Sequence, residues 1–89
     1  MKIKSGFVIQ KVGASYLAVA TGERAKEFRA LVRLNGTGAF LWELLSSGDR
    51  DDAALLAALL EEYDVTEEVA KRDIEAFKKT LAEAGILDV

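Results

Sequence analysis

The segment from Arg29 to Leu45 constrains the fold of this 89-residue chain more than any other part of the sequence. Its letters, RALVRLNGTGAFLWELL, predict a short strand that passes through one polar turn into an apolar helix. Because side chains alternate along a strand, one face would carry Arg29, Leu31 and Arg33, and the other Ala30, Val32 and Leu34. Asn35 can cap the helix that begins near Gly36. We therefore expect a strand with arginines on one face, joined directly to a helix of the core.

Strand and helix patterns elsewhere complete the predicted fold. Val, Ile and Phe are frequent in the first third, where a Gly-Ala-Ser turn separates two runs and indicates an antiparallel hairpin. Amphipathic helices follow, the last with Ala70, Ile74, Phe77 and Leu81 on one face. The expected strands span about residues 7–12, 16–20 and 28–34, and the expected helices about 36–46, 52–63 and 67–84. We predict one α+β domain over residues 1–89, winged-helix-like, with a three-stranded antiparallel sheet followed by three helices.

Several single residues refine this prediction. Asp51 and Thr66 are expected to cap the second and third helices, because their side-chain oxygens can accept from the free N–H groups of a first turn. Gly85 is expected to end the third helix, after which Ile86 and Leu87 would fold back against the core. Trp42 is expected to pack in the core rather than to anchor a partner.

The absence of histidine and cysteine narrows the possible functions. Without them the chain has no thiol nucleophile, no thiolate or imidazole metal ligand and no triad that uses imidazole as its base. The net charge is −3, whereas nucleic-acid-binding domains usually carry a basic excess. No apolar run approaches the roughly 18 residues of a membrane span, and the first residues do not resemble a signal peptide. We therefore expect a cytoplasmic protein that is not an enzyme, with no cofactor, metal, nucleic acid or membrane partner.

The third predicted strand has two interpretations. In a meander of three strands it lies at an edge, with unpaired N–H and C=O groups that can recruit an extended peptide. Arg29 and Arg33 would then suit an acidic partner segment. Alternatively, the two arginines only keep the edge soluble and prevent aggregation. The residues themselves leave both interpretations open.

Three segments resemble the coenzyme PQQ synthesis protein D (PqqD) family, in the same order and over nearly the whole chain. They are LNGTGAFLWELL from Leu34 to Leu45, L-x-x-x-L-L-E-E-Y-D-V from Leu55 to Val65, and D-I-E-A-F-x-x-x-L-x-x-x-G-I-L from Asp73 to Leu87. The resemblance implies a non-catalytic precursor-peptide (RiPP) recognition element. Such a domain binds the leader segment of a ribosomally made peptide and presents the peptide to a modifying enzyme, often a radical SAM protein. The leader is implied to add as a strand against the third strand, in a groove walled by the third helix.

Carried onto this sequence, the resemblance makes residues 29–34 the receiving strand and residues 71–81 the wall of the groove. The expected peptide-binding residues are Arg29, Ala30, Leu31, Val32, Arg33, Leu34, Lys71, Asp73, Ile74, Phe77, Lys78 and Leu81. The expected partners are a precursor leader peptide, a modifying enzyme and, in a homodimer, a second copy. Two alternatives stay open: a winged-helix DNA-binding domain, and a structural or oligomerising subunit that pairs through the same strand edge.

Overall fold

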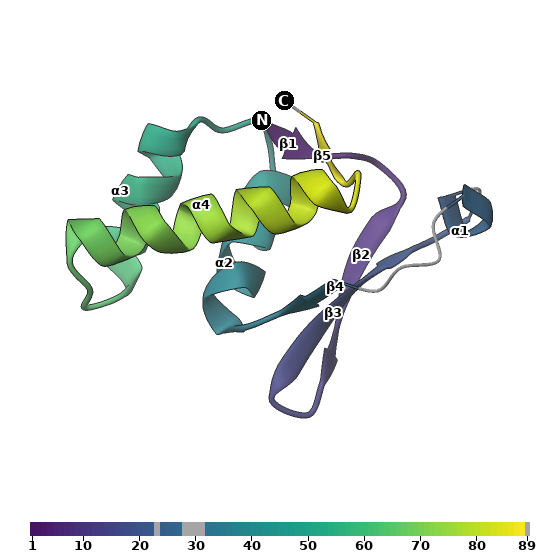
Figure 1. Cartoon of the computed structure of the whole chain (residues 1–89), viewed down its shortest axis with the longest axis horizontal. Coiled ribbons are helices and arrows are strands. Elements are labelled where there is room, and N and C mark those ends of the chain that lie inside the picture. Colours follow the sequence, from purple (N-terminus) through teal and green to yellow (C-terminus); the bar gives the residue numbers. More distant parts are fainter. Residues whose placement is uncertain (23, 28–31, 89) are drawn as a thin grey trace.

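A three-stranded antiparallel sheet and three long helices form the main elements of the computed structural model, which describes residues 1–22, 24–27 and 32–88 (Figure 1). In chain order the elements are β1 (Lys2–Ile3), β2 (Phe7–Val12), β3 (Ser15–Ala20), α1 (Arg24–Glu27), β4 (Val32–Leu34), α2 (Gly36–Ser46), α3 (Asp52–Glu62), α4 (Glu67–Glu83) and β5 (Leu87–Asp88). The predicted α+β class is therefore confirmed, with the main helices following the sheet in the chain.

The larger sheet has the strand order β2-β3-β4, and both of its strand pairs are antiparallel. A two-residue turn joins β2 to β3, since Val12 pairs directly with Ser15. Gly13, the first residue of that turn, has a φ of +62°, which glycine adopts without steric cost and which a type II′ hairpin turn requires there. In Figure 1 this hairpin extends away from the helices.

Each of the three long helices begins at the predicted cap. The side chain of Asn35 accepts from the Gly38 N–H at 2.8 Å, that of Asp51 from the Ala54 N–H at 2.9 Å, and that of Thr66 from the Val69 N–H at 3.2 Å. Each contact satisfies one of the backbone donors that a helix start leaves unpaired. The helix boundaries lie within one residue of those predicted, because these polar residues separate the apolar runs.

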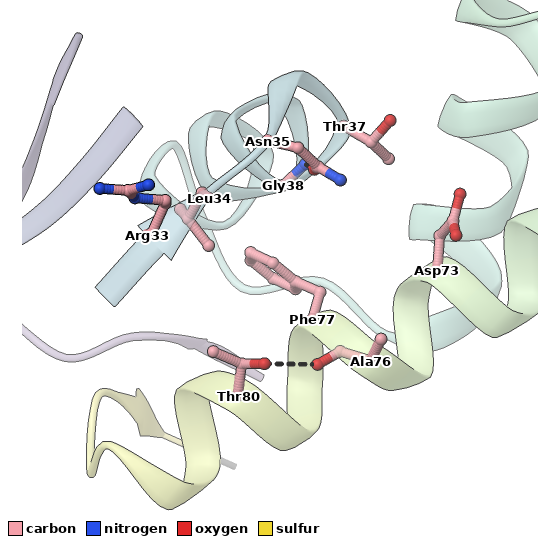
Figure 2. A pocket seen from close by; sticks show the side chains of 9 residues that line it. All are labelled: Arg33, Leu34, Asn35, Thr37, Gly38, Asp73, Ala76, Phe77 and Thr80. Atoms are coloured by element: carbon pink, nitrogen blue, oxygen red, sulfur yellow. Dashed lines mark hydrogen bonds between the residues drawn. The ribbon is translucent and has the colours of Figure 1, made fainter. Parts of the chain in front are cut away.

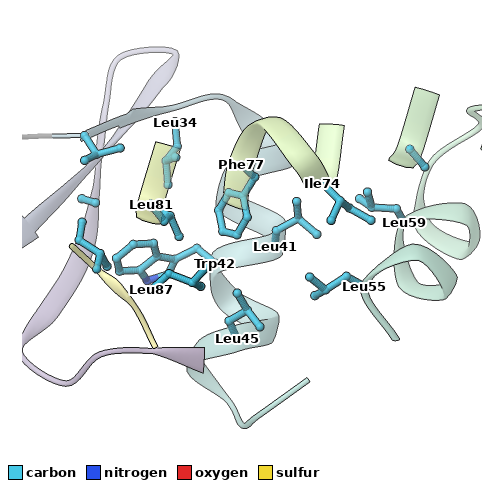
Figure 3. Close-up of a cluster of buried hydrophobic side chains, with 14 residues drawn as sticks. Leu34, Leu41, Trp42, Leu45, Leu55, Leu59, Ile74, Phe77, Leu81 and Leu87 are labelled. Carbon is cyan, nitrogen blue, oxygen red and sulfur yellow. The ribbon is translucent and has the colours of Figure 1, made fainter. Parts of the chain in front are cut away.

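A single cluster of buried side chains joins the sheet to the three long helices (Figure 3). The last helix contributes Ala70, Ile74, Phe77 and Leu81 to it, as its periodicity predicts. Trp42 is 2% exposed, so its predicted place in the core is confirmed. Val32 and Leu34 of β4 are buried and Arg33 between them is exposed, which is the alternation expected for this strand. This packing fixes β4 against the rest of the molecule.

Two short strands near the ends of the chain form a second, two-stranded sheet. Ile3 of β1 pairs with Leu87 of β5, and the Lys4 N–H donates to the Ile86 carbonyl at 2.8 Å. Ile86 and Leu87 are buried, so the predicted return of this segment to the core is confirmed. The sequence did not predict the pairing with β1, because two residues are too few to show an alternating pattern.

The other differences lie between β3 and β4. The polar connection contains the one-turn helix α1, which is too short to give a helical periodicity in the sequence. The predicted third strand began at residue 28, but residues 28–31 lie outside the described part of the chain, and β4 begins at Val32. No helix in the described part is long and apolar enough to cross a membrane.

Candidate functional site

The edge of β4 opposite β3 pairs with no strand in the described part of the chain. On its paired side, Val32, Arg33 and Leu34 lie opposite Ala18, Leu17 and Tyr16 of β3. An unpaired strand edge presents main-chain donors and acceptors that an extended peptide can use. The predicted edge position of this strand is therefore confirmed for Val32–Leu34.

The register of the sheet decides which residue of β4 directs its main chain toward that edge. The Thr21 N–H donates to the Gly6 carbonyl at 2.8 Å, so Thr21 and Gly6 form a hydrogen-bonded pair just beyond β2 and β3. Because such pairs alternate along an antiparallel ladder, the odd-numbered residues of β3 bond to β2 and the even-numbered ones bond to β4. Leu17 therefore makes no ladder bond to Arg33, and the N–H and C=O of Arg33 point to the open edge.

A groove runs beside this edge, between the β4–α2 junction and α4 (Figure 2). Its volume is about 160 Å³, which is below the range of roughly 300–1,000 Å³ typical of small-molecule sites. It is lined by Arg33, Leu34, Asn35, Thr37, Gly38, Asp73, Ala76, Phe77 and Thr80. A groove of this size next to a free strand edge suits one or two side chains of an extended segment better than a compact ligand.

The lining of the groove combines an apolar floor with an acidic side chain. Figure 2 shows Phe77 pointing from α4 toward Leu34, and both side chains are largely buried. Asp73 lines the groove from α4, and Arg33 borders it from β4 with its side chain pointing away from Phe77 (Figure 2). The Thr80 hydroxyl donates to the Ala76 carbonyl at 2.9 Å, so its proton is used within the helix. The groove can therefore hold an apolar side chain beside an acidic one on the α4 wall.

The structure brings only part of the predicted peptide site to this groove. Arg33, Leu34, Asp73 and Phe77 line it, and Val32 lies in the same strand. Ile74 and Leu81 are 3% and 0% exposed and belong to the core behind the wall. Arg29, Ala30 and Leu31 lie outside the described residues.

Lys71 and Lys78 are not in the groove. Lys71 lines a different hollow, between α3 and α4, with Leu56 and Ile74. The Lys78 ammonium contacts the Asp52 carboxylate at 2.9 Å, across to α3, and the Glu75 carboxylate at 3.4 Å. Lys71 lies three residues before Ile74 and Lys78 four residues after it, so both lysines lie on the side of α4 that faces α3. The structure therefore places both lysines outside the groove beside β4, and their contact with a peptide stays a prediction.

Five groove residues were missing from the predicted site: Asn35, Thr37, Gly38, Ala76 and Thr80. The sequence singled out Asn35 only as a helix cap. Ala76 and Thr80 follow Asp73 at helical spacings of three and seven, so extending the face of Asp73 along α4 would have identified them. Within the described ranges, no three His, Cys, Asp or Glu side chains gather closely enough to hold a metal ion.

The close approach of α2 to β4 depends on Gly38. A Cβ atom placed there would lie 3.2 Å from the Leu34 Cβ and 3.3 Å from the Asn35 Oδ1, whereas one on Gly36 would meet nothing within 4 Å. We expect the free energy of unfolding of Gly38→Ala to be about 1–3 kcal/mol lower than that of Gly36→Ala, because the added methyl displaces Leu34. Urea unfolding of the two variants measures this difference. Equal stability would show that α2 and β4 do not pack as described.

The contact of Lys78 with α3 gives a second testable prediction. Pairing with the Asp52 carboxylate raises the pKa of Lys78 above its ordinary value of 10.5. A raised lysine pKa stabilises the folded state below pH 10.5, and this contribution is lost as the pH rises through the folded-state pKa. Lys78→Gln should lower the free energy of unfolding by only about 0.2–1 kcal/mol at neutral pH, because Asp52 is exposed.

Urea titrations of parent and Lys78→Gln at pH 7 and above pH 10.5 test this, and the difference between the two proteins should shrink at the higher pH. Lys79→Gln is the control, since Lys79 is exposed and has no ion pair in the described structure. A constant difference at both pH values would exclude the ion pair as its cause.

Comparison with known proteins adds two findings. A family model described as coenzyme PQQ synthesis protein D (PqqD) matches residues 20–87 of the chain. Among solved structures, the chain is similar to one described as TbiB1 in complex with the TbiA(beta) leader peptide, with a TM-score of 0.74 and 24% sequence identity. The likeness covers 99% of this chain and 95% of that chain, so the two share a fold over nearly their whole length. No significant match is found among curated proteins.

Proposed function

We propose that this chain, which belongs to the coenzyme PQQ synthesis protein D family, captures the leader segment of a ribosomally synthesised precursor peptide and presents it to a modifying enzyme. The observation that carries the proposal is the free edge of β4 beside a groove walled by α4. The structural neighbour described as a complex with a leader peptide has the same fold, which supports this choice of guest.

In the proposed complex the leader lies along β4 as a fourth strand of the larger sheet. The outward N–H and C=O of Arg33 bond to the main chain of the guest, which provides affinity without regard to sequence. Side chains of the guest alternate, so every second one enters the groove and contacts Leu34 and Phe77. The Arg33 guanidinium favours an acidic leader residue and the Asp73 carboxylate a basic one, which sets the direction and register of the guest.

The module itself is proposed to be non-catalytic and to act in the cytoplasm, where precursor peptides leave the ribosome. Neither of the two charged groups that line the groove is buried, and a desolvated, hydrogen-bonded side chain is what acid–base or nucleophilic catalysis needs. The chemistry would belong to the partner enzyme. A radical SAM protein is one candidate for this partner, and the groove does not distinguish it from other classes.

The test of this function is a titration with leader peptides. Short reading frames next to the gene of this chain supply the candidates, and their N-terminal halves are synthesised with a fluorescent label. Fluorescence anisotropy should detect one that binds in the micromolar range or tighter, while a shuffled version of the same composition should not bind. A salt-sensitive shift of generic duplex DNA in the absence of any peptide binding would instead indicate a DNA-binding domain.

The strand edge could also pair with that of a second copy, so the same sample needs a size measurement. Light scattering at several protein concentrations, with and without the bound peptide, separates the two uses of the edge. We expect any dimer that forms through β4 to dissociate when peptide saturates the protein, because both guests need the same main-chain groups. A dimer that persists in the presence of bound peptide would show that β4 is not the shared edge.

A further inference from the structure

The outer face of the larger sheet carries four apolar side chains beside Gln10 and Ser15, where mostly polar residues are expected. We call the side chains of Val8, Val12, Leu17 and Val19 the outer strip. Val8 pairs directly with Val19 across β2 and β3, and alternation places Leu17 and Val12 on the same face. Val8 and Val12 are 43% and 54% exposed, and none of the four belongs to the core cluster. An antiparallel sheet with one solvated face normally presents polar residues on that face.

The outer strip lies in the basic half of a chain with divided charge. Residues 1–34 contain seven lysines and arginines against two glutamates, whereas residues 35–89 contain five against thirteen acidic residues. Arg33 is exposed and lies on the same face as the strip, since it pairs with Leu17. A surface that covers the strip would therefore need apolar side chains with a carboxylate near Arg33.

The strip is also continuous with the edge that receives the leader. Leu17 lies directly opposite Arg33 on β4, so one cross-strand row runs from Gln10 through Leu17 to Arg33. A strand added to the free edge of β4 extends that row by one residue, because alternate side chains of the guest point to the same face. A protein seated on the outer strip would thus touch the bound leader as well.

We propose that the outer strip is the docking surface for the modifying enzyme, through an apolar patch of that enzyme with an acidic side chain opposite Arg33. This inference rests on the proposed function, because it needs a leader on β4 and an enzyme that acts on the same peptide. The enzyme contacts the module and the outward-facing side chains of the leader at once. Leader and enzyme therefore raise each other's affinity for the module by the same factor.

A second copy of this chain fits the strip less well. Two outer strips placed face to face would bring two exposed Arg33 side chains near each other, and like charges at an interface are unfavourable. A lipid bilayer is a weaker candidate as well, because the strip lacks the tryptophan and tyrosine side chains that anchor interfacial segments. Both alternatives can be measured in the same experiment.

The test compares two double variants of the full chain. Val8→Gln with Val12→Gln removes the exposed half of the outer strip. Leu60→Gln with Val65→Gln is the matched control, since these side chains are 40% and 38% exposed and lie on α3 and the loop after it. The probe is the purified enzyme whose gene adjoins that of the module, titrated by calorimetry with and without the leader that anisotropy has identified.

We expect the strip variant to bind the enzyme about tenfold more weakly or worse, because the interface loses the apolar area of two valines. It should bind the leader within twofold of the parent, and the control variant should match the parent in both assays. The parent's affinity for the enzyme should fall modestly as salt rises, because Arg33 contributes screened attraction. Unchanged enzyme binding by the strip variant would overturn the inference while leaving leader capture intact.

Two further results would also overturn it. A parent dimer in light scattering that dissociates in the strip variant would assign the strip to a second copy. Sedimentation of the parent, but not of the variant, with vesicles of phosphatidylcholine and phosphatidylglycerol would assign it to a membrane. Failure of the leader to bind the parent at all would instead contradict the proposed function, so the two failures are distinguishable.

Discussion

Arg33→Pro is expected to weaken leader binding by roughly 10- to 100-fold while the protein stays folded. Proline removes the main-chain donor that points to the free edge, so the opposing guest carbonyl loses its partner, at a cost of about 1–3 kcal/mol. The ladder between β3 and β4 uses the N–H groups of Val32 and Leu34, and these remain. Proline is tolerated in an edge strand when its nitrogen faces outward. Anisotropy with the labelled leader measures the affinity, and circular dichroism with thermal unfolding checks the fold.

Arg33→Ala is the matched control, because it also removes the guanidinium but keeps the N–H. An exposed ion pair contributes about 0.2–1 kcal/mol, so this variant should lose less than about fivefold in affinity. The additional loss of affinity in Arg33→Pro, compared with Arg33→Ala, then measures the contribution of the main-chain hydrogen bond. Val32→Pro would not test strand addition, because it also removes a hydrogen bond to β3. A loss of affinity in that variant could therefore reflect a loss of stability. Equal affinities for the two Arg33 variants would argue against strand addition.

Filling the groove from α4 should have an effect of similar size. Ala76 is exposed on the wall, and tryptophan at this position places an indole ring in a groove of about 160 Å³. That volume does not hold an indole and a guest side chain together, so Ala76→Trp should lower leader affinity more than about tenfold. The free energy of unfolding should stay within about 0.5 kcal/mol of the parent, because the substitution touches no buried contact.

The same helix offers a control with the identical substitution. Ala82 is also exposed, but it lies six residues further along α4 on a different face and does not line the groove. Ala82→Trp should bind the leader as the parent does. Loss of affinity in both variants would point to a general effect of the added indole, and retention in both would remove α4 from the binding site.

The helices and the sheet order could be predicted from the sequence because strong local signals mark them. Asn35, Asp51 and Thr66 stand immediately before apolar runs, and each run keeps a helical period until it ends. The edge position of β4 followed from a simple meander of three strands. The pairing of β1 with β5 could not be predicted, because it joins two dipeptides from opposite ends of the chain.

The candidate site was harder to predict than the fold, since it depends on how α4 is rotated. Charge and proximity in the sequence made Lys71 and Lys78 plausible partners for an acidic leader. The apolar stripe of α4 separates two flanks, however, and these lysines lie on the flank that faces α3. The opposite flank, with Asp73, Ala76 and Thr80, faces β4. Periodicity identifies both flanks but does not assign a neighbour to either, which only the packed structure does.

Amide hydrogen exchange measured by NMR is the most direct test of strand addition at β4. We expect saturating leader peptide to slow exchange of the Arg33 amide strongly, to leave the already bonded amides of Val32 and Leu34 little changed, and to shift the resonances of Asp73, Ala76 and Phe77. A leader that binds tightly while the Arg33 amide exchanges as fast as in the free protein would contradict the account.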